Sequence, residues 1–98
     1  MRILKEFEKG NTIYFEVEFR NVNAKLWDPQ SGSPRYSITN LQGLEIVTGP
    51  LLKRDIGFWY AFYVPSSVGT FTISFTGTIE DSDVIIKRKF RVVETRLK

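Results

Sequence analysis

The chain has 98 residues, 42% of them hydrophobic and 14% aromatic, which is enough for one domain with a two-layer core and is unlike a disordered chain. It contains no cysteine and no histidine, which excludes a disulfide framework, nucleophile pairs of the Ser-His-Asp or Cys-His type, and zinc sites made from Cys and His. The net charge of +3 is uneven, because residues 84–98 hold six basic residues against one acidic residue, a balance of +5 that leaves −2 for the remainder.

The first part of the chain predicts short strands separated by turns. Residues 3–7 form a first strand that ends at a turn over residues 9–11. Residues 12–20 alternate apolar and polar side chains throughout, which is typical of a strand with one buried face. A loop dense in turn-forming residues follows at 26–32. Residues 34–39 predict the next strand.

The second part contains the strongest strand signals. Residues 41–48 predict a strand that Gly49 and Pro50 interrupt. Residues 57–65 and 69–77 are two runs of aromatic and β-branched residues joined by a short Pro/Ser/Gly connection, the pattern of an antiparallel pair. An acidic turn at 80–83 leads into a last strand over 84–94. About seven strands at spacings of 8 to 12 residues indicate a sandwich or barrel.

Several of these residues resemble a known signature. The set Gly57, Trp59, Tyr63, Pro65, Gly69, Phe71, Ile73 and Phe75 is similar to the Gly-x-Tyr-x-x-x-Tyr-x-Pro…Gly-x-Tyr-x-Ile pattern of immunoglobulin-like sandwiches. Gly10-Asn11, Asp28-Pro29 and Phe90-Arg-Val92 resemble further positions of that pattern. Filamin-type repeats and small bacterial and phage structural domains both carry it. The resemblance implies an all-β fold: one Ig-like antiparallel β-sandwich with Greek-key topology over residues 1–98, with 94–98 as a tail.

One strand has more apolar surface than a single core can use. If Trp59, Ala61 and Tyr63 point inward, then Phe58, Tyr60 and Phe62 point outward, beside Tyr14 of the neighbouring strand. Monomers seldom expose such a patch. It predicts a surface for self-association or a protein partner. Two alternatives are a loop at 49–53 that covers the patch and a platform on which sugars stack.

The basic last strand permits a second hypothesis. Lys87, Lys89 and Arg91 share one face and could follow the phosphates of a nucleic acid or another polyanion. Aromatic residues for stacking are missing from that face, and charged side chains also protect exposed strands from edge-to-edge pairing. Edge protection is therefore the preferred interpretation, and nucleic acid is not expected as a partner. Arg88 lies on the apolar face, which indicates a bulge or a side chain that extends to solvent.

The acidic residues offer two further hypotheses. Glu80, Asp81 and Asp83 could bind Ca²⁺, although a turn whose side chains bond their own backbone is the simpler interpretation. Glu16 and Glu18 could form a glycosidase-like pair, although such pairs on an exposed strand are usually solvated. We therefore expect no catalytic residues, no metal, no cofactor and no small-molecule substrate.

These observations predict a non-enzymatic structural or interaction module. The resemblance to phage-type domains implies a virion neck, tail or head accessory protein that assembles through the aromatic strand face. A carbohydrate-binding module and a nucleic-acid binder remain as alternatives. The first residues are charged where a signal peptide needs an apolar segment, and no apolar run is long enough to span a bilayer. We expect a protein that is cytoplasmic as synthesised, associated with a virion where that role applies, and not bound to membranes.

Overall fold

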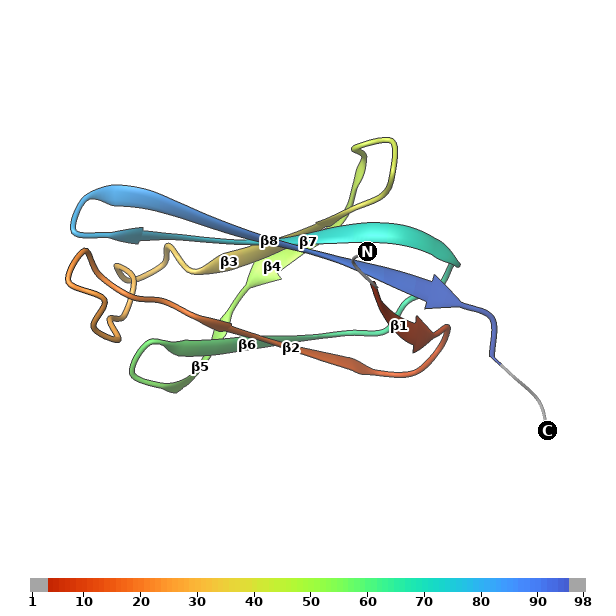
Figure 1. Ribbon diagram of the computed structural model, residues 1–98, viewed down its shortest axis with the longest axis horizontal. Helices are drawn as coiled ribbons and strands as arrows, with labels where there is room; N and C mark the ends of the chain where they lie inside the picture. Colours follow the sequence, from red (N-terminus) through yellow and green to blue (C-terminus); the bar gives the residue numbers. More distant parts are fainter. Residues whose placement is uncertain (1–3, 96–98) are drawn as a thin grey trace.

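A computed structural model describes residues 4–95. Within that range the chain forms eight strands and no helix, arranged as two sheets packed face to face (Figure 1). A five-stranded sheet has the order β1-β8-β7-β3-β4, and a three-stranded sheet has the order β2-β6-β5. The strands are β1 Lys5–Glu8, β2 Ile13–Glu18, β3 Arg35–Thr39, β4 Glu45–Pro50, β5 Leu52–Asp55, β6 Phe58–Tyr63, β7 Gly69–Ile79 and β8 Ser82–Val93. The fold is an all-β sandwich, as the sequence predicts.

The chain passes between the two sheets four times, after β1, β2, β4 and β6. Strand β3 consequently lies between β4 and β7 instead of beside β2, which is a Greek-key arrangement. One pairing departs from the purely antiparallel sandwich expected. Strand β1 runs parallel to β8, with Lys5 opposite Phe90 and Glu8 opposite Val93. The predicted antiparallel sandwich is confirmed in the other strand pairings, and this edge differs because β1 joins the last strand instead of its neighbour β2.

Two of the predicted strand boundaries were also wrong. Gly49 and Pro50 belong to the end of β4 and do not interrupt a strand, while residues 41–44 form the turn before it. Pro50 is tolerated because β4 is the edge of its sheet, where an N–H on the outer side is not needed. Strand β5 was not predicted. All four of its side chains are exposed, so it shows no alternation that a sequence pattern could detect.

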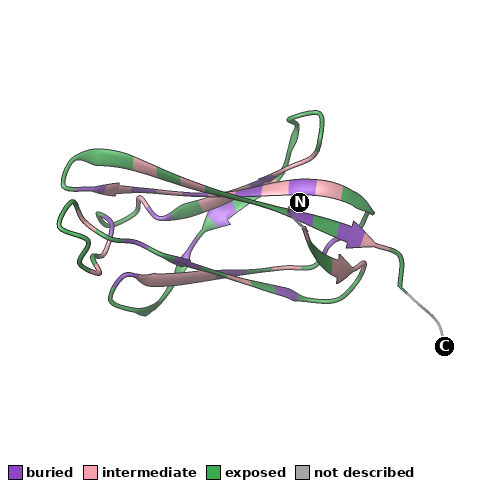
Figure 2. Ribbon diagram, viewed as in Figure 1, coloured by how far each residue is buried: buried purple, intermediate pink, exposed green. Residues whose placement is uncertain are grey.

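The core lies between the sheets and is built from inward-facing residues of both (Figure 2). Strand β7 shows the pattern most clearly: every second residue from Phe71 to Ile79 is buried, and the residues between them are half-buried. The rings of Phe7 and Phe15 contact each other at 6.1 Å between centroids, and both contact Phe90. The fully or nearly buried apolar residues are Ile13, Val17, Phe19, Ile38, Leu51, Ala61, Phe71, Ile73, Phe75, Ile79, Phe90 and Val92.

A carboxylate anchors the turn between β5 and β6. Asp28 Oδ1 accepts hydrogen bonds from the Gly57 N–H at 2.8 Å and from Trp59 Nε1 at 3.3 Å, and Asp28 Oδ2 pairs with Lys53 Nζ at 2.6 Å. The Gly57 N–H, followed by Lys53, lowers the pKa of Asp28 because both interactions favour the ionised form. One side chain of the 26–32 loop thus holds the three-stranded sheet's β5–β6 hairpin.

Candidate functional site

The outward face of the three-stranded sheet carries the predicted aromatic residues. In the β2–β6 pairing Tyr14 lies opposite Phe62, Glu16 opposite Tyr60, and Glu18 opposite Phe58. Ala61 is buried and Trp59 packs against the core, so side chains of the opposite parity point away from the core. Strand β5 extends the surface, because Leu52 lies opposite Tyr60. We call this surface, made of Tyr14, Leu52, Phe58, Tyr60 and Phe62, the aromatic face.

Three of the rings contact one another. The Tyr14 and Tyr60 centroids are 5.5 Å apart, those of Tyr14 and Phe62 are 5.4 Å apart, and those of Tyr60 and Phe62 are 5.6 Å apart. Tyr14 is 45% exposed and Phe62 is 55% exposed, whereas Tyr60 and Phe58 are half-buried. The structure therefore brings Tyr14, Tyr60 and Phe62 together as one cluster and leaves Phe58 at its margin, opposite Glu18.

The segment proposed as a cover does not lie over this cluster. Residues 49–50 end β4, and Leu52 and Lys53 begin β5, which pairs with β6 in the plane of the sheet. Leu52 is itself 50% exposed and adds to the apolar surface. The covering-loop alternative was wrong, because the chain turns into an edge strand at this point.

The charged groups on the aromatic face pair with one another. Glu16 Oε2 accepts a hydrogen bond from Arg54 Nη1 at 2.5 Å and another from the Tyr14 hydroxyl at 2.7 Å. The Arg54 interaction, followed by the Tyr14 hydrogen bond, lowers the pKa of Glu16, and the same hydrogen bond to Glu16 raises the pKa of Tyr14. Glu18 pairs with Arg20. A general acid needs a raised pKa, so Glu16 has the opposite of that environment.

Sequence reasoning missed Leu52 and Arg54. Both lie on β5, and they reach the aromatic face because β5 pairs with β6. Arg54 and Glu16 are 38 positions apart and lie on the two outer strands of this sheet. No local pattern connects them, and only recognition of β5 as a strand would have placed them on one surface.

The predicted basic residues share the outward face of the other sheet, but they differ in their partners. In the β7–β8 pairing Lys87 lies opposite Ser74, Lys89 opposite Thr72, and Arg91 opposite Thr70. Arg91 Nη1 is 3.5 Å from Glu6 Oε2 on β1. Within residues 4–95 neither Lys87 nor Lys89 forms an ion pair. The set is thus divided into one paired arginine and two lysines with no described carboxylate partner.

Arg88 occurs in a regular part of β8. Its pairing opposite Ile73 continues the register of the strand without a shift, so the suggested bulge is wrong. Its side chain is exposed, and Nη1 donates to the Lys87 carbonyl at 3.3 Å. The alternative interpretation agrees with this geometry: Arg88 starts on the face of β8 that carries the apolar residues, and its side chain extends to solvent.

The acidic turn between β7 and β8 forms hydrogen bonds with neighbouring side chains. Asp81 Oδ1 accepts from Gln30 Nε2 at 2.8 Å, and Asp83 Oδ1 accepts from the Thr78 hydroxyl at 3.1 Å. Glu80 and Asp81 have positive φ values of 50° and 64°, as expected at the corner of a tight hairpin. In the described part of the chain there is no group of three or more acidic side chains placed to hold a metal ion.

Residues 4–95 contain no helix that is long and apolar enough to cross a lipid bilayer. No protein-family model matches the chain, and no curated protein sequence is significantly similar to it.

Proposed function

We propose that this chain is a non-enzymatic structural module that associates with further copies of itself through the aromatic face. The observation that supports this most strongly is the cluster of Tyr14, Tyr60 and Phe62, whose rings touch each other and face outward with Leu52 beside them. An apolar surface of this kind is uncommon on a monomer and is typical of interfaces, in which Tyr and Phe are enriched.

The charges on this surface favour a second copy as the partner. Its two carboxylates, Glu16 and Glu18, are paired with Arg54 and Arg20 from the same chain. The surface is therefore close to neutral, and two copies can approach face to face without repulsion. A partner with a strong charge of either sign would gain little from it. By contrast, Lys87 and Lys89 on the opposite outer face would repel their counterparts in a second copy.

The size of the surface predicts a weak interaction. An aromatic side chain buries on the order of 150–250 Å² when it is fully covered, and three half-exposed rings supply only part of the roughly 800 Å² that each partner of a stable complex usually buries. Association of a single pair is therefore expected to be transient. Many weak contacts between copies held in one assembly add up through effective concentration, which suits a structural component.

The order of the strands supports the Ig-like part of the proposal. If β2, β3, β6, β7 and β8 correspond to strands B, C, E, F and G of an immunoglobulin-type sandwich, then one sheet is B-E-D and the other is G-F-C, with β1 added beside G and a C′ strand, β4, beside C. The resemblance to small bacterial and phage domains then implies a virion accessory role. This role agrees with a module whose exposed chemistry is suited to contact between copies.

The relative orientations of the rings favour protein contact over sugar stacking. The Tyr14 and Tyr60 planes are inclined by 31°, those of Tyr14 and Phe62 by 54°, and those of Tyr60 and Phe62 by 75°. A platform for a flat sugar ring needs an open ring face, whereas these rings pack edge and face against one another. Protein side chains can fill the resulting uneven surface.

The test is sedimentation velocity over a range of concentrations, with Phe62→Ser as the variant and Leu41→Ser as its control. Phe62 is 55% exposed on the aromatic face, and Leu41 is 74% exposed at the β3–β4 turn. Wild type and Leu41→Ser should associate as concentration rises, while Phe62→Ser should stay monomeric, with an association constant at least about tenfold lower. Circular dichroism checks that all three are folded. A wild type that is monomeric at millimolar concentration would contradict the proposal.

A further inference from the structure

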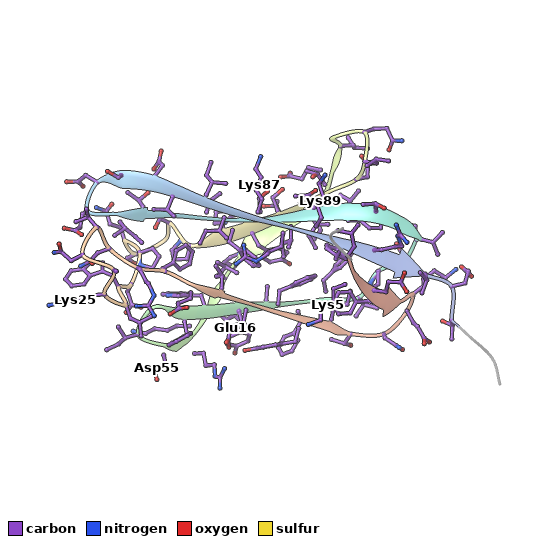
Figure 3. The ribbon with its side chains drawn as sticks, in the orientation of Figure 1. Lys5, Glu16, Lys25, Asp55, Lys87 and Lys89 are labelled. Carbon is purple, nitrogen blue, oxygen red and sulfur yellow. The ribbon has the colours of Figure 1, made fainter. Side chains whose placement is uncertain are left out.

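The outer face of the five-stranded sheet contains an open hollow of about 1290 Å³. Strands β7 and β8 form its floor, and the β3–β4 turn with Asn40 and Leu41 forms one side. Four cationic side chains line it, Lys5, Lys87, Arg88 and Lys89, and no carboxylate does. Figure 3 shows Lys87 and Lys89 on the side of the molecule opposite Glu16, so this surface is separate from the aromatic face.

The floor of the hollow pairs cations with hydroxyl groups. Lys89 lies directly across from Thr72 and Lys87 directly across from Ser74. The Cβ atoms of each lysine and of the hydroxyl residue opposite it are therefore about 5 Å apart. Successive outward residues on a strand are about 7 Å apart. The result is a short double row in which a positive charge and a hydrogen-bonding hydroxyl repeat along the strands.

Edge protection also fits the two lysines, because they lie on a stretch of β8 that has no outer neighbour. Strand β1 pairs with β8 only at residues 90–93, so residues 82–89 of β8 form a sheet edge. Charged side chains protect such an edge from pairing with another chain, and the exposed side chain of Arg88, on the parity of the core, adds a further charge there. Lys87 and Lys89 have the other parity and project over the hollow, where they have no acidic partner within residues 4–95.

We propose that this hollow binds a linear acidic polysaccharide, with its sulfate or carboxylate groups at Lys87 and Lys89 and its sugar hydroxyls at Thr72 and Ser74. Lysine is a compact point charge that suits an oxyanion, and basic patches of this kind bind both sulfated glycans and nucleic acids. No aromatic side chain lines the hollow, so the unpaired bases of a nucleic acid would find nothing on which to stack. The hydroxyls and the Asn40 amide suit a ligand rich in hydroxyl groups.

The test measures the binding of a fluorescent heparin oligosaccharide by anisotropy, at about 50 mM and about 200 mM salt. Wild type should bind, and the affinity should fall as salt rises. Lys87→Ala combined with Lys89→Ala should weaken binding about tenfold and reduce the salt dependence. The control Lys25→Glu changes the net charge by the same −2 on an exposed loop residue outside the hollow, and it should weaken binding less than about twofold.

Three further results distinguish this site from a general attraction to negative charge. Thr72→Val keeps the shape and charge but removes a hydroxyl, and it should weaken heparin binding about threefold. Phe62→Ser should bind heparin as wild type does, which separates this site from self-association. A single-stranded DNA of similar length should bind less tightly than heparin, because its bases find no aromatic side chain on which to stack. The proposal is overturned by no heparin binding at low salt, by equal losses in the lysine variant and in Lys25→Glu, by an unchanged Thr72→Val, or by tighter binding of DNA.

Discussion

The outer face of the three-stranded sheet presents touching aromatic rings with internally paired charges, whereas the outer face of the five-stranded sheet presents hydroxyls and lysines over a hollow. Both sheets have the same kind of inward pattern, in which every second residue is buried or half-buried against the core. Because the period of a strand is two, the outward residues can change without disturbing the core. The sandwich can therefore present two surfaces of unrelated chemistry on one 98-residue chain.

The two sheets also differ in the interactions that stabilise them. The five-stranded sheet contains the longest pairing, β7 with β8 over eleven residue pairs. The three-stranded sheet has a short edge strand, β5, whose hairpin depends on Asp28 and Gly57. We therefore predict that substitutions at Asp28 and Gly57 destabilise the hairpin that carries part of the aromatic face, although both residues lie outside that face.

The largest effect is expected for Gly57→Ala. Gly57 has a φ of +77°, and an added Cβ would lie 2.9 Å from the Phe19 carbonyl oxygen and 3.0 Å from the Leu26 Cβ. Backbone strain and this clash should lower the free energy of unfolding by about 3 kcal/mol, measured by urea denaturation. The control is Gly10→Ala, which has a φ of +89° but nothing within 4 Å, and it should cost about 1 kcal/mol. Equal losses would show that the close packing around Gly57 contributes nothing.

An intermediate loss of folding stability is expected for Asp28→Asn, and this loss should depend on pH. Hydrogen bonds from Gly57 and Lys53 lower the pKa of Asp28 in the folded state, below its unfolded value of about 3.9. The stabilisation is therefore present above the unfolded pKa and is lost as pH falls through the folded pKa. At pH 7 the variant should be less stable by about 1 kcal/mol, and the difference should shrink below about pH 4.

The control for this acid dependence is Asp55→Asn. Asp55 Oδ1 accepts a hydrogen bond from the N–H of the next residue, Ile56, and its side chain is exposed at the end of β5. Thermal unfolding at a series of pH values compares the variants with wild type. If Asp28→Asn and wild type lose stability in parallel from pH 5 to pH 2, the anchoring role given to the ionised Asp28 is incorrect.

The smallest effect is expected when the charges on the aromatic face are removed. The double variant Glu16→Gln with Arg54→Gln removes a pair whose Arg54 side chain is 62% exposed, and exposed pairs contribute little. The free energy of unfolding should hardly change, and self-association should persist. Glu6→Gln with Arg91→Gln makes the same change on the other sheet and should have a similarly small effect. Loss of association in the Glu16 variant alone would mean that charge, and not apolar contact, drives the interface.

The sequence predicted which residues of these strands face the core, because a strand with one buried face alternates apolar and polar side chains. The alternation in β2 and in β7 identified their buried faces and placed their ends to within two residues. Strand β5 could not be found this way, since all four of its residues are exposed and its pairing comes from β6. The parallel pairing of β1 with β8 was equally hidden, because it joins residues 85 positions apart.

The candidate site, like the fold, was predicted only in part. Parity along β6 placed Tyr60 and Phe62 outward with Tyr14, and these three rings form a cluster in the structure. The contribution of Leu52 was missed together with its strand. The different environments of Arg91 and Lys89 could not be read from the sequence either, because they depend on Glu6, which β1 brings beside Arg91 alone.

The parallel pairing of β1 with β8 has a mechanical consequence. The chain enters β1 at Lys5 and leaves β8 at Val93, which are opposite ends of the paired segment. A pulling force transmitted along the chain from both sides would slide these strands past each other and load their hydrogen bonds together, instead of opening them one after another. Forced unfolding is governed by the unfolding rate, so we expect a pairing loaded in this way to resist tension better than one that opens pair by pair.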